Sequence, residues 1–403
     1  MQHIVIIGGG FAGVSAGVYL RKYLDHITKN NIQVTVIDKN PYHTFTPSLY
    51  EVATSEEPQG NVAIPFTEIF DHQITYLKDG VKQIHANEKM VELVDHKKVP
   101  YDYLIIALGS QPAFMHIPGL EENCVTLKSM KDALHIRNMI KSMCCEEGIC
   151  HRKVNVVVGG GGFSGTEIAA ELLTYKDRLA AQHKLDKDCL DITIIQGSDR
   201  LLKELDSHVS KIAEKRLSSP YVHFAFGGHI KEVTKTEVKT DNGKAYPYHM
   251  LIWTGGVEAN HMARTSGLPV NKKGQLTVNS FLQVEGYENI FAAGDIAGYI
   301  DPKTQEPVPT VAQVAEEQGE IAAENVIRAI QGKSFEPYNY RHFGYVVPLR
   351  GKYATAELMF NIHVDGFPGW VLQQLVYLRY LLRILPFRKA FTRWNTFEEN
   401  LLQ

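Results

Sequence analysis

The sequence lacks a hydrophobic run long enough to cross a bilayer. A spanning helix needs about 20 consecutive apolar residues, and no stretch of this chain approaches that length. No signal peptide precedes the first predicted strand, so we expect a cytosolic chain or the mature form of a processed one.

Cysteine is scarce, and all of it lies in the first half of the chain. An odd number of cysteines in a chain of this length does not indicate a disulfide framework. We interpret them as thiols in a reducing compartment and predict no metal site. The cysteines are Cys124, Cys144, Cys145, Cys150 and Cys189.

A strong imbalance of charge is absent as well. The 403 residues include 42 Lys and Arg against 45 Asp and Glu, for a net charge of -3, so we predict no nucleic-acid partner. A hydrophobic content of 44% is ordinary for a globular protein, and the length allows two or three domains.

The first pattern that is present is a glycine-rich turn near the start of the chain. An apolar run typical of a buried strand leads into G-x-G-x-x-G spacing and then a predicted helix. In this motif the first glycine makes a tight turn, the second lets a diphosphate approach the backbone, and the third lets helix and strand pack closely. A second predicted strand ends in Asp38, which is placed to bind a ribose hydroxyl. The elements are His3–Ile7, Gly8, Gly10, Gly13, Ser15–Arg21 and Ile32–Ile37.

The same pattern begins again after residue 150. A predicted strand at 154–158 is followed by Gly160, Gly162 and Gly165, a helix at 166–175 and a second strand at 191–195. One such motif alone could be an ordinary turn between a strand and a helix. Two in one chain indicate an internal repeat of a dinucleotide-binding unit.

Three further predicted strands, 101–109, 251–257 and 289–296, also run into glycines. Asp295 follows Gly294, and an acid there can bind a ribityl hydroxyl while the N-terminus of the helix predicted over 310–330 faces phosphate. The stretch 41–65, rich in Pro, Ser and Thr, is predicted to be an irregular loop that lines a cofactor.

Taken together, these motifs resemble those of flavoproteins with two dinucleotide-binding domains. The resemblance covers about residues 1–335 and includes ALGS near residue 109, WTGGV near 255 and AAGD near 294. It implies an α/β fold of two Rossmann-like domains in the glutathione-reductase-like arrangement. Residues 1–118 and 265–335 would form a FAD-binding domain, 150–264 an NAD(P)H-binding domain, and 336–403 a C-terminal membrane-association segment.

Cysteine placement narrows the branch of this family. Disulfide reductases carry a redox CxxxxC shortly after the first unit, but no cysteine precedes Cys124; sulfide:quinone oxidoreductases need one in the C-terminal half, but none follows Cys189. The segments 38–55, WTGGV and AQVAEEQG (312–319) are similar to those of type II NADH:quinone oxidoreductases. This resemblance implies FAD-dependent oxidation of NADH and two-electron reduction of a membrane quinone, without proton pumping.

The resemblance also implies the site residues. Glu167 would orient the nicotinamide amide or relay protons, although it could merely interact with the helix dipole. Gln313 and Glu317 would line the quinone site on one helix face, although a core helix with a solvated Glu face is the alternative. The residues expected to bind FAD or NADH are Gly8, Gly10, Phe11, Ala12, Gly13, Asp38, Lys39, Thr46, Val81, Ala107, Gly109, Gly160, Gly162, Phe163, Ser164, Gly165, Glu167, Gln196, Gly255, Gly256, Gly294, Asp295, Ala312 and Gln313.

Two of these positions depart from the family pattern. Glu317 stands where the family has a second Gln, and Gln196 stands where it usually has an acid that binds the adenosine ribose. A carboxylate would repel a 2′-phosphate and Gln does not, so NADH is expected but NADPH is not excluded.

The C-terminal segment 370–393 is a basic amphipathic pattern with frequent aromatics. No acidic residue occurs between Asp365 and Glu398, and Pro386 should divide the segment into two helices. The pattern predicts helices that lie in an anionic membrane surface, with a domain-packing or dimer helix as the alternative. The resemblance agrees, and implies a monotopic anchor on the cytoplasmic face and a homodimer. Removing residues 366–403 is expected to leave a soluble FAD protein.

Two other functions remain open at this stage. One is a soluble reductase that passes electrons from NAD(P)H through FAD to a small carrier protein. The other is a non-enzymatic FAD-binding scaffold or redox sensor, which would hold a yellow cofactor that NADH does not bleach.

Overall fold

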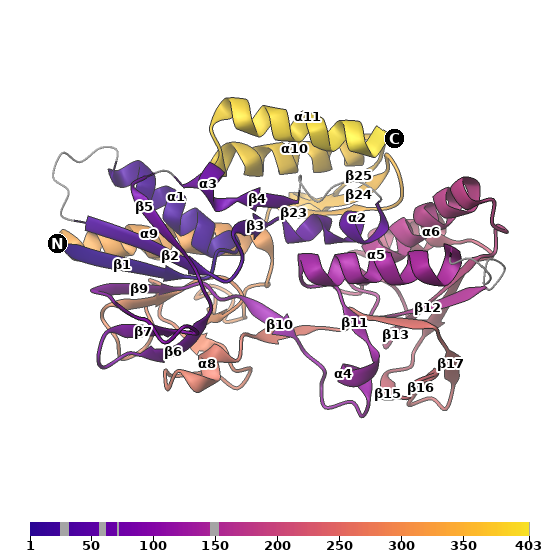
Figure 1. Cartoon of the computed structure of the whole chain (residues 1–403), viewed down its shortest axis with the longest axis horizontal. Coiled ribbons are helices and arrows are strands. Elements are labelled where there is room, and N and C mark those ends of the chain that lie inside the picture. The colour runs from indigo at the N-terminus through magenta and orange to yellow at the C-terminus, as the bar shows by residue number, and fades with distance from the viewer. Residues whose placement is uncertain (25–31, 56–61, 71, 146–152, 403) are drawn as a thin grey trace.

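The computed structural model of the chain describes residues 1–24, 32–55, 62–70, 72–145 and 153–402. Two parallel five-stranded sheets lie side by side, the first on the left of Figure 1 and the second on the right. The first has the order β21 (Ile290–Ala292), β9 (Tyr103–Ile106), β1 (Gln2–Ile7), β2 (Ile32–Asp38) and β5 (Ile74–Lys78). The second has the order β11 (Val125–Thr126), β18 (Met250–Trp253), β12 (Val154–Gly159), β13 (Leu190–Gln196) and β14 (Val222–Phe226).

The central strand of each sheet is the one that leads into a glycine turn. The side chains of Ile4 to Ile7 in β1 are fully buried, as continuous aliphatic runs are in parallel sheets covered on both faces. β12 occupies the same place in the second sheet and pairs in parallel with β13 and β18. The predicted repeat of an α/β dinucleotide-binding fold is therefore confirmed.

The repeat extends beyond the glycine turns. Each unit also carries a three-stranded antiparallel meander. The first meander is β6 (Val81–His85), β7 (Met90–Leu93) and β8 (Lys98–Pro100); the second is β15 (Ile230–Val233), β16 (Glu237–Thr240) and β17 (Ala245–Pro247).

Long helices follow the glycine turns and the last strand of the first sheet. α1 (Phe11–Leu24) follows the first turn, α6 (Phe163–His183) the second, and α9 (Ala312–Ile330) the Gly294 turn. α1 and α9 pack closely at Gly319, where an added Cβ atom would lie 2.1 Å from the carbonyl oxygen of Ala12. This contact holds the start of α9 beside the first glycine turn.

The stretch 41–65 is not an irregular loop, and that prediction is wrong. It contains β3 (Tyr42–Thr44), a 3₁₀ turn at Thr46–Ser48, α2 (Leu49–Thr54) and β4 (Ala63–Pro65). α2 buries Leu49, Tyr50, Val52 and Ala53 and packs against α6 and α5 (Met130–Cys145). The helix depends on burial between the two units rather than on local sequence signals.

The two units are joined by an antiparallel strand pair, β10 (Ser110–Pro112) with β19 (Val257–Ala259). β11 belongs to the second sheet although it precedes residue 150, and the domain boundaries stay proposals. The remaining short elements are α3 (Phe66–Ile69), α4 (Leu120–Asn123), α7 (Ser207–Leu217), α8 (Met262–Thr265), β20 (Leu276–Thr277) and β22 (Ala297–Gly298).

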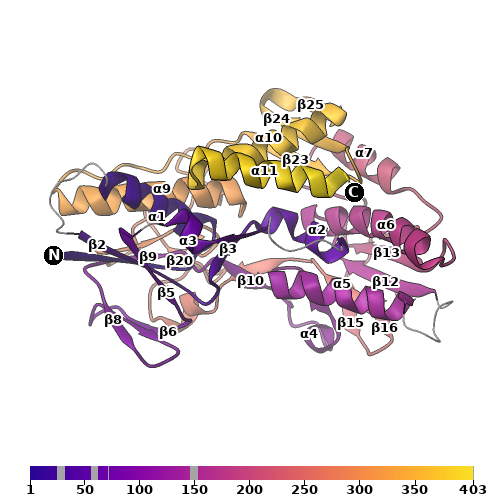
Figure 2. The same cartoon turned by 45° about the horizontal axis from the view of Figure 1, so that its top comes forward.

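The C-terminal segment consists of a small antiparallel sheet and two helices. Strands β23 (Gly344–Pro348), β24 (Ala354–Leu358) and β25 (Ile362–Gly366) lead into α10 (Phe367–Ile384) and α11 (Phe387–Leu402). The break at Pro386 agrees with the sequence-based prediction. Figures 1 and 2 show α10 and α11 lying over the junction of the two units.

Candidate functional site

A large cleft of about 1790 Å³ runs between the two units and the C-terminal segment. Its wall contains both glycine-turn regions, the start of α9 and the inner face of α10. Nineteen of the predicted site residues line it: Gly8, Gly10, Phe11, Ala12, Asp38, Lys39, Thr46, Val81, Ala107, Gly109, Phe163, Ser164, Glu167, Gly256, Gly294, Asp295, Ala312, Gln313 and Glu317.

The other predicted residues lie behind the wall or to one side of the cleft. They are Gly13, Gly160, Gly162, Gly165, Gln196 and Gly255. Gly13 and Gly165 are packing positions, since a Cβ atom there would lie 1.8 and 1.9 Å from the carbonyl oxygens of Gly8 and Gly160. In both turns the third glycine packs against the carbonyl oxygen of the first, so the two repeats share this contact.

The middle glycine of each turn borders open space. A Cβ atom added at Gly10 or Gly162 would meet no atom within 4 Å, although both backbones start a long helix. Exposed N–H groups at a helix N-terminus with room in front of them can take a diphosphate. The residues present therefore suit two dinucleotides.

The side chain at the end of the second strand closes each turn in the same way. The N–H of Gly9 donates to Oδ2 of Asp38 at 2.6 Å, and the N–H of Gly161 donates to Oε1 of Gln196 at 2.9 Å. Burial raises the pKa of Asp38, against the lowering effect of backbone N–H bonds. The amide of Gln196 also donates to Oγ of Ser198 at 2.8 Å, so both of its polar atoms are engaged.

Asp295 is part of a network that the sequence did not reveal. The hydroxyl of Ser110 donates to Oδ2 of Asp295 at 2.5 Å, and Nζ of Lys128 donates to that hydroxyl at 2.7 Å. The three side chains line the cleft from three separate segments. They form a polar part of the cleft wall beside the first glycine turn, since a Cβ atom added at Gly294 would lie 3.3 Å from Cβ of Ala12.

A cluster of carboxyl groups lies where α2 meets α6. Burial raises the pKa of Glu167 to about 8, and burial likewise raises the pKa of Glu51 to about 8, with repulsion from Glu171 added to the latter. The hydroxyl of Tyr50 donates to Oε1 of Glu51 at 2.9 Å. Glu167 is therefore largely neutral near pH 7. A neutral carboxyl group does not act mainly as a charge that interacts with the dipole of the helix.

Gln313 and Glu317 share a face of α9, as predicted. Nε2 of Gln313 donates to Oε1 of Glu317 at 3.0 Å, and the hydroxyl of Tyr338 donates to Oε2 at 3.3 Å. The two predicted residues are thus one hydrogen-bonded pair on the cleft wall.

The neighbouring Glu316 is buried and faces α10. Its Oε2 accepts from Nη1 of Arg383 at 3.1 Å and lies 3.6 Å from Nη2 of Arg379. Burial raises the pKa of Glu316 to about 7, against the lowering effect of the two arginines. Arg383 also pairs with Glu320, so α10 is clamped to α9 beside the cleft.

Sequence reasoning missed several of these groups. Glu316 directly precedes the predicted Glu317, but nothing in the Gln- and Glu-rich sequence around it marked it as buried. Gln318, which accepts the N–H of Gly294 at 2.8 Å, was adjacent to a family position. Ser110 lies in the ALGS motif and Glu51 in the segment 38–55, but neither was singled out, and Lys128 lies in no motif; the roles of these residues depend on contacts distant in sequence.

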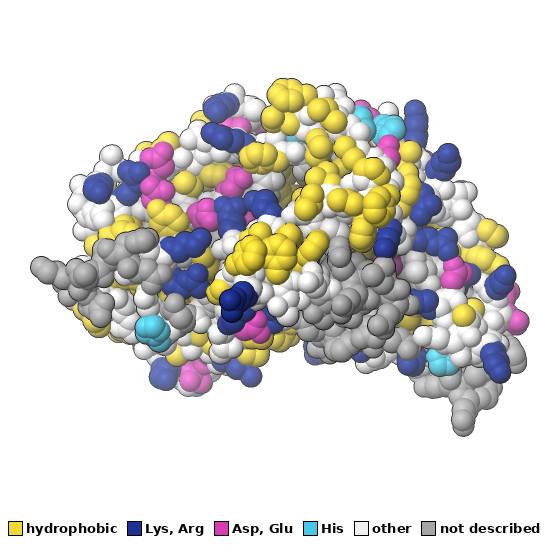
Figure 3. All heavy atoms as spheres, turned by 90° about the horizontal axis from the view of Figure 1, so that it is seen from above, with side chains coloured by type: hydrophobic (Ala, Val, Ile, Leu, Met, Phe, Trp, Pro, Cys, Tyr) yellow, Lys and Arg dark blue, Asp and Glu magenta, His cyan; other side chains and the backbone are white. Residues whose placement is uncertain are grey.

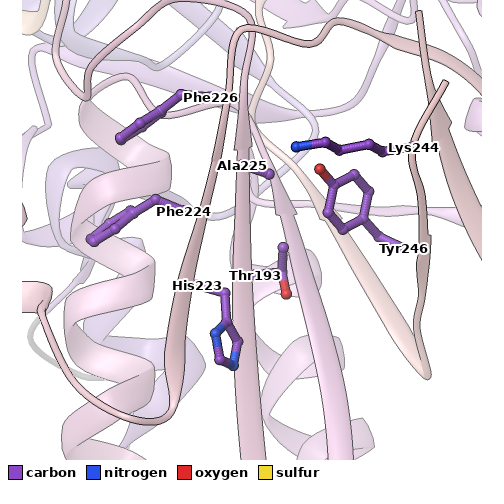
Figure 4. Close-up of a pocket in the computed structure, with 7 residues that line it drawn as sticks. All are labelled: Thr193, His223, Phe224, Ala225, Phe226, Lys244 and Tyr246. Atoms are coloured by element: carbon purple, nitrogen blue, oxygen red, sulfur yellow. The ribbon is translucent and has the colours of Figure 1, made fainter. Parts of the chain in front are cut away.

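A second hollow, of about 480 Å³, lies at the edge strand β14 of the second unit. Figure 4 shows Phe224 and Phe226 pointing to the side away from Lys244 and Tyr246. His223 at this hollow is paired with Asp191 at 3.1 Å. The hollow and the cleft have no lining residue in common.

The described residues offer no metal site, no membrane-spanning helix and no disulfide bond. No group of three or more His, Cys, Asp or Glu side chains there could hold a metal ion. Within the same residues, no helix has the length and hydrophobicity needed to cross a bilayer. Cys124, Cys144 and Cys189 form no disulfide bonds, whereas the side chains of Cys145 and Cys150 lie outside the described part.

The chain is similar to known oxidoreductases over most of its length. The sequence profile of the family "Pyridine nucleotide-disulphide oxidoreductase" matches residues 2–319. The type II NADH:quinone oxidoreductase of Haemophilus influenzae is 27% identical over 390 residues, which span 89% of this chain and 87% of that protein. The demethylphylloquinone reductase NdbB of Synechocystis is 29% identical over 383 residues, spanning 93% and 91%. The structure of NDH2 from Plasmodium falciparum in complex with RYL-552 has a TM-score of 0.85 at 19% identity, covering 100% of this chain and 97% of that one, and shows the same fold.

Proposed function

The chain belongs to the pyridine nucleotide-disulphide oxidoreductase family, and on that basis we propose that it is a type II NADH:quinone oxidoreductase. It would use FAD to oxidise NADH and to reduce a membrane quinone by two electrons, without pumping protons. The curated relatives that bear this name support the resemblance read from the motifs.

One observation carries the proposal. A single cleft is lined by the first glycine turn, by Glu167 of the second unit and by the Gln313–Glu317 pair of α9. Two nucleotides and a third, apolar substrate can therefore meet in one space. No side chain of a protein accepts hydride, so a bound redox cofactor is required.

The residues of the first unit suit FAD. Gly8 and Gly10 would hold the diphosphate, Asp38 the adenosine ribose and Asp295 the ribityl chain, with Ser110 and Lys128 fixing the Asp295 carboxylate. When bound, FAD supplies the two-electron redox chemistry that the side chains lack.

The carboxyl cluster would handle protons. NADH oxidation with quinone reduction takes up one proton from solvent per turnover. Glu167 and Glu51, both with pKa raised to about 8 by burial, hold protons at neutral pH at the cleft wall and beside it. Glu167 would also orient the nicotinamide amide.

The outer face of α10 supports a membrane location. Large apolar side chains there are exposed, while the inner face lines the cleft. We propose monotopic association with the cytoplasmic face of a membrane, so that quinone enters the cleft from the bilayer. The exposed residues of this face are Phe367, Leu375, Val376, Leu382 and, at the start of α11, Phe387. Figure 3 shows hydrophobic side chains gathered on the side of the molecule that carries α10 and α11.

A homodimer through these helices is part of the same proposal, and sedimentation in detergent would test it.

Anaerobic titration of the purified protein tests the function. We expect acid release of FAD, bleaching of the bound flavin by NADH, and reoxidation by quinones. A flavin that NADH bleaches but quinones do not reoxidise would point instead to a protein electron carrier. A flavin that neither NADH nor NADPH bleaches would overturn the enzymatic proposal.

A further inference from the structure

The turn between β24 and β25 carries three neighbouring apolar side chains in water. We call Met359, Phe360, Asn361 and Ile362 the hairpin tip. The side chain of Phe360 is 82% exposed, and Met359 and Ile362 are also exposed. Phe360 and Asn361 have φ of 67° and 56°, a left-handed conformation that turns the chain sharply and directs the aromatic ring outward.

The hairpin tip borders the mouth of the cleft. Leu358, directly before the tip, lines the cleft and pairs with Gly344 of β23. Phe343, next to Gly344, lines the cleft and is itself 52% exposed. α10 packs against β24 and β25 of the same small sheet.

The exposed face of α10 continues this rim. Val376 and Arg379 are exposed and also line the cleft. Exposed residues of two apolar features, Phe343 beside the hairpin tip and Val376 on α10, therefore belong to the cleft wall. A contiguous apolar surface around a cavity mouth indicates an interaction site rather than ordinary surface.

The charges around this rim favour a lipid surface as the occupant. The acidic side chains of the hairpin are engaged with the segment at the start of α7, since Glu357 accepts the N–H of Asp206 at 2.9 Å and Asp365 pairs with His208 at 2.6 Å. The tip itself contains no acid. Arg379, Arg383 and Arg393 of α10 and α11 pair with acidic side chains of the protein, whereas Arg388 and Lys389 are exposed on the same C-terminal segment. Anionic phospholipid attracts such bases, and its acyl region accepts exposed aromatic and aliphatic side chains.

We propose that the hairpin tip is a second membrane-inserting element, which together with α10 seats the mouth of the cleft in the bilayer. Membrane insertion of the tip does not depend on the proposed function; only the identity of the substrate that would enter the cleft, a quinone, rests on it. Insertion at two separate points, both adjoining the cleft wall, fixes the tilt of the protein and holds the cleft at the depth of a long-tailed quinone. One helix alone would leave the protein able to rock about the helix axis.

Vesicle binding tests the proposal directly. The triple variant M359S/F360S/I362S and the single variant F360S are compared with wild type by flotation with vesicles of phosphatidylcholine and phosphatidylglycerol in equal amounts. Salt at about 1 M shortens the Debye length to about 3 Å and leaves mainly the apolar contribution. At that salt we expect the partition coefficient to fall by about tenfold for the triple variant. M115S removes an equally exposed apolar side chain elsewhere and should bind as wild type does.

Activity provides a second readout. With NADH and a long-tailed quinone in the same vesicles, the triple variant should be several-fold slower. With a short-chain, water-soluble quinone it should match wild type. If wild type reduces no quinone at all, the proposed function fails, while flotation still decides the role of the tip.

A tryptophan probe measures insertion of the tip without any serine substitution. F360W keeps an aromatic ring, and its extra fluorescence over wild type should be quenched by vesicles with bromine in the acyl chains. Absence of that quenching, or unchanged flotation of the triple variant at high salt, overturns the proposal. One further result would also overturn it: wild type sediments as a dimer without lipid, while the triple variant sediments as a monomer and binds vesicles as wild type does. The tip would then contact a second copy of the chain.

Discussion

The hydroxyl of Tyr380, on α10, lies 2.7 Å from Nε2 of His43, on β3. Nδ1 of the same imidazole lies 3.0 Å from the carbonyl oxygen of Gly9, in the first glycine turn. Complete burial lowers the pKa of His43 to about 4, so the ring is neutral at pH 7. Because a carbonyl only accepts, Nδ1 carries the proton and Nε2 accepts from the tyrosine. A continuous hydrogen-bonded chain thus joins the C-terminal helix to the turn proposed to hold FAD.

Tyr380→Phe should therefore weaken FAD binding. It leaves a buried imidazole nitrogen without a donor, which costs about 1–3 kcal/mol. If about 1.4 kcal/mol of this cost falls on the geometry of the glycine turn, the Kd for FAD rises by roughly tenfold, measured by fluorescence titration of the apoprotein. Tyr248→Phe removes a comparable hydroxyl, bonded to Thr234 at 2.6 Å in the second unit, and should leave the Kd unchanged. Equal effects of the two variants would reduce Tyr380 to general stability.

Removal of residues 366–403 should abolish folding rather than release a soluble FAD protein. The sequence favoured the second outcome, but the structure buries Tyr377, Tyr380 and Leu381 in the main core. The deletion would also leave the buried Glu316 without its arginine partners. We expect insoluble protein without flavin. A shorter deletion of residues 387–403 removes α11 alone, and should keep FAD bound.

The sequence could predict those features that depend on residues close together along the chain, and not those that depend on contacts between distant segments. The glycine turns, Asp38 and the Gln313–Glu317 face follow from patterns a few residues long, and each lies where its pattern indicated. The contact of Tyr380 with His43 spans 337 residues, and no local pattern marks either residue. α10 was interpreted as a basic amphipathic membrane helix. That its arginines pair with Glu316 and Glu320, and that its tyrosines are buried, could be recognised only once the partner surface was known.

Stability should fall with rising pH because of the carboxyl cluster. A carboxyl whose folded pKa is about 8 binds its proton more tightly in the folded than in the unfolded state, where the pKa is near 4.5. The folded state therefore loses stability as pH rises from about 4.5 to about 8. Glu51→Gln mimics the neutral form, and its Tm should exceed that of wild type by a few degrees at pH 8.5 and by little at pH 5.

The exposed Glu204 supplies the control for this measurement. Glu204→Gln should give the same Tm difference at both pH values. Because Glu167 lies on the cleft wall and burial raises its pKa to about 8, the rate of flavin bleaching by NADH should change as the pH passes that value. A Tm difference for Glu51→Gln that does not change with pH would mean that Glu51 is ionised in the folded protein.

Gln196→Glu should sharpen the preference for NADH. The carboxylate would still accept the N–H of Gly161, but it would place a negative charge where a 2′-phosphate approaches. We expect the ratio of kcat/KM for NADH over NADPH to rise by at least about tenfold, a change of about 1.4 kcal/mol. Ser198→Ala removes the neighbouring hydroxyl without a charge and should change the ratio less. Wild type that already rejects NADPH by several orders of magnitude would contradict this interpretation of the strand end.

The last prediction concerns the pair on α9. Gln313→Ala removes the amide that donates to Glu317, and should raise the KM for quinone by roughly tenfold while flavin bleaching by NADH stays intact. Glu317→Gln restores the amide of the family pattern, and Tyr338 can still donate to its carbonyl oxygen. This variant should therefore keep its fold and change which quinones are reduced fastest, measured as kcat/KM across a quinone series. Asn325→Ala tests the same helix away from the cleft: it breaks bonds to Phe281 and Glu336 and should lower Tm without a selective effect on quinone. Equal loss of flavin reduction and quinone reduction in Gln313→Ala would show that the helix has shifted, and would remove the pair from the quinone site.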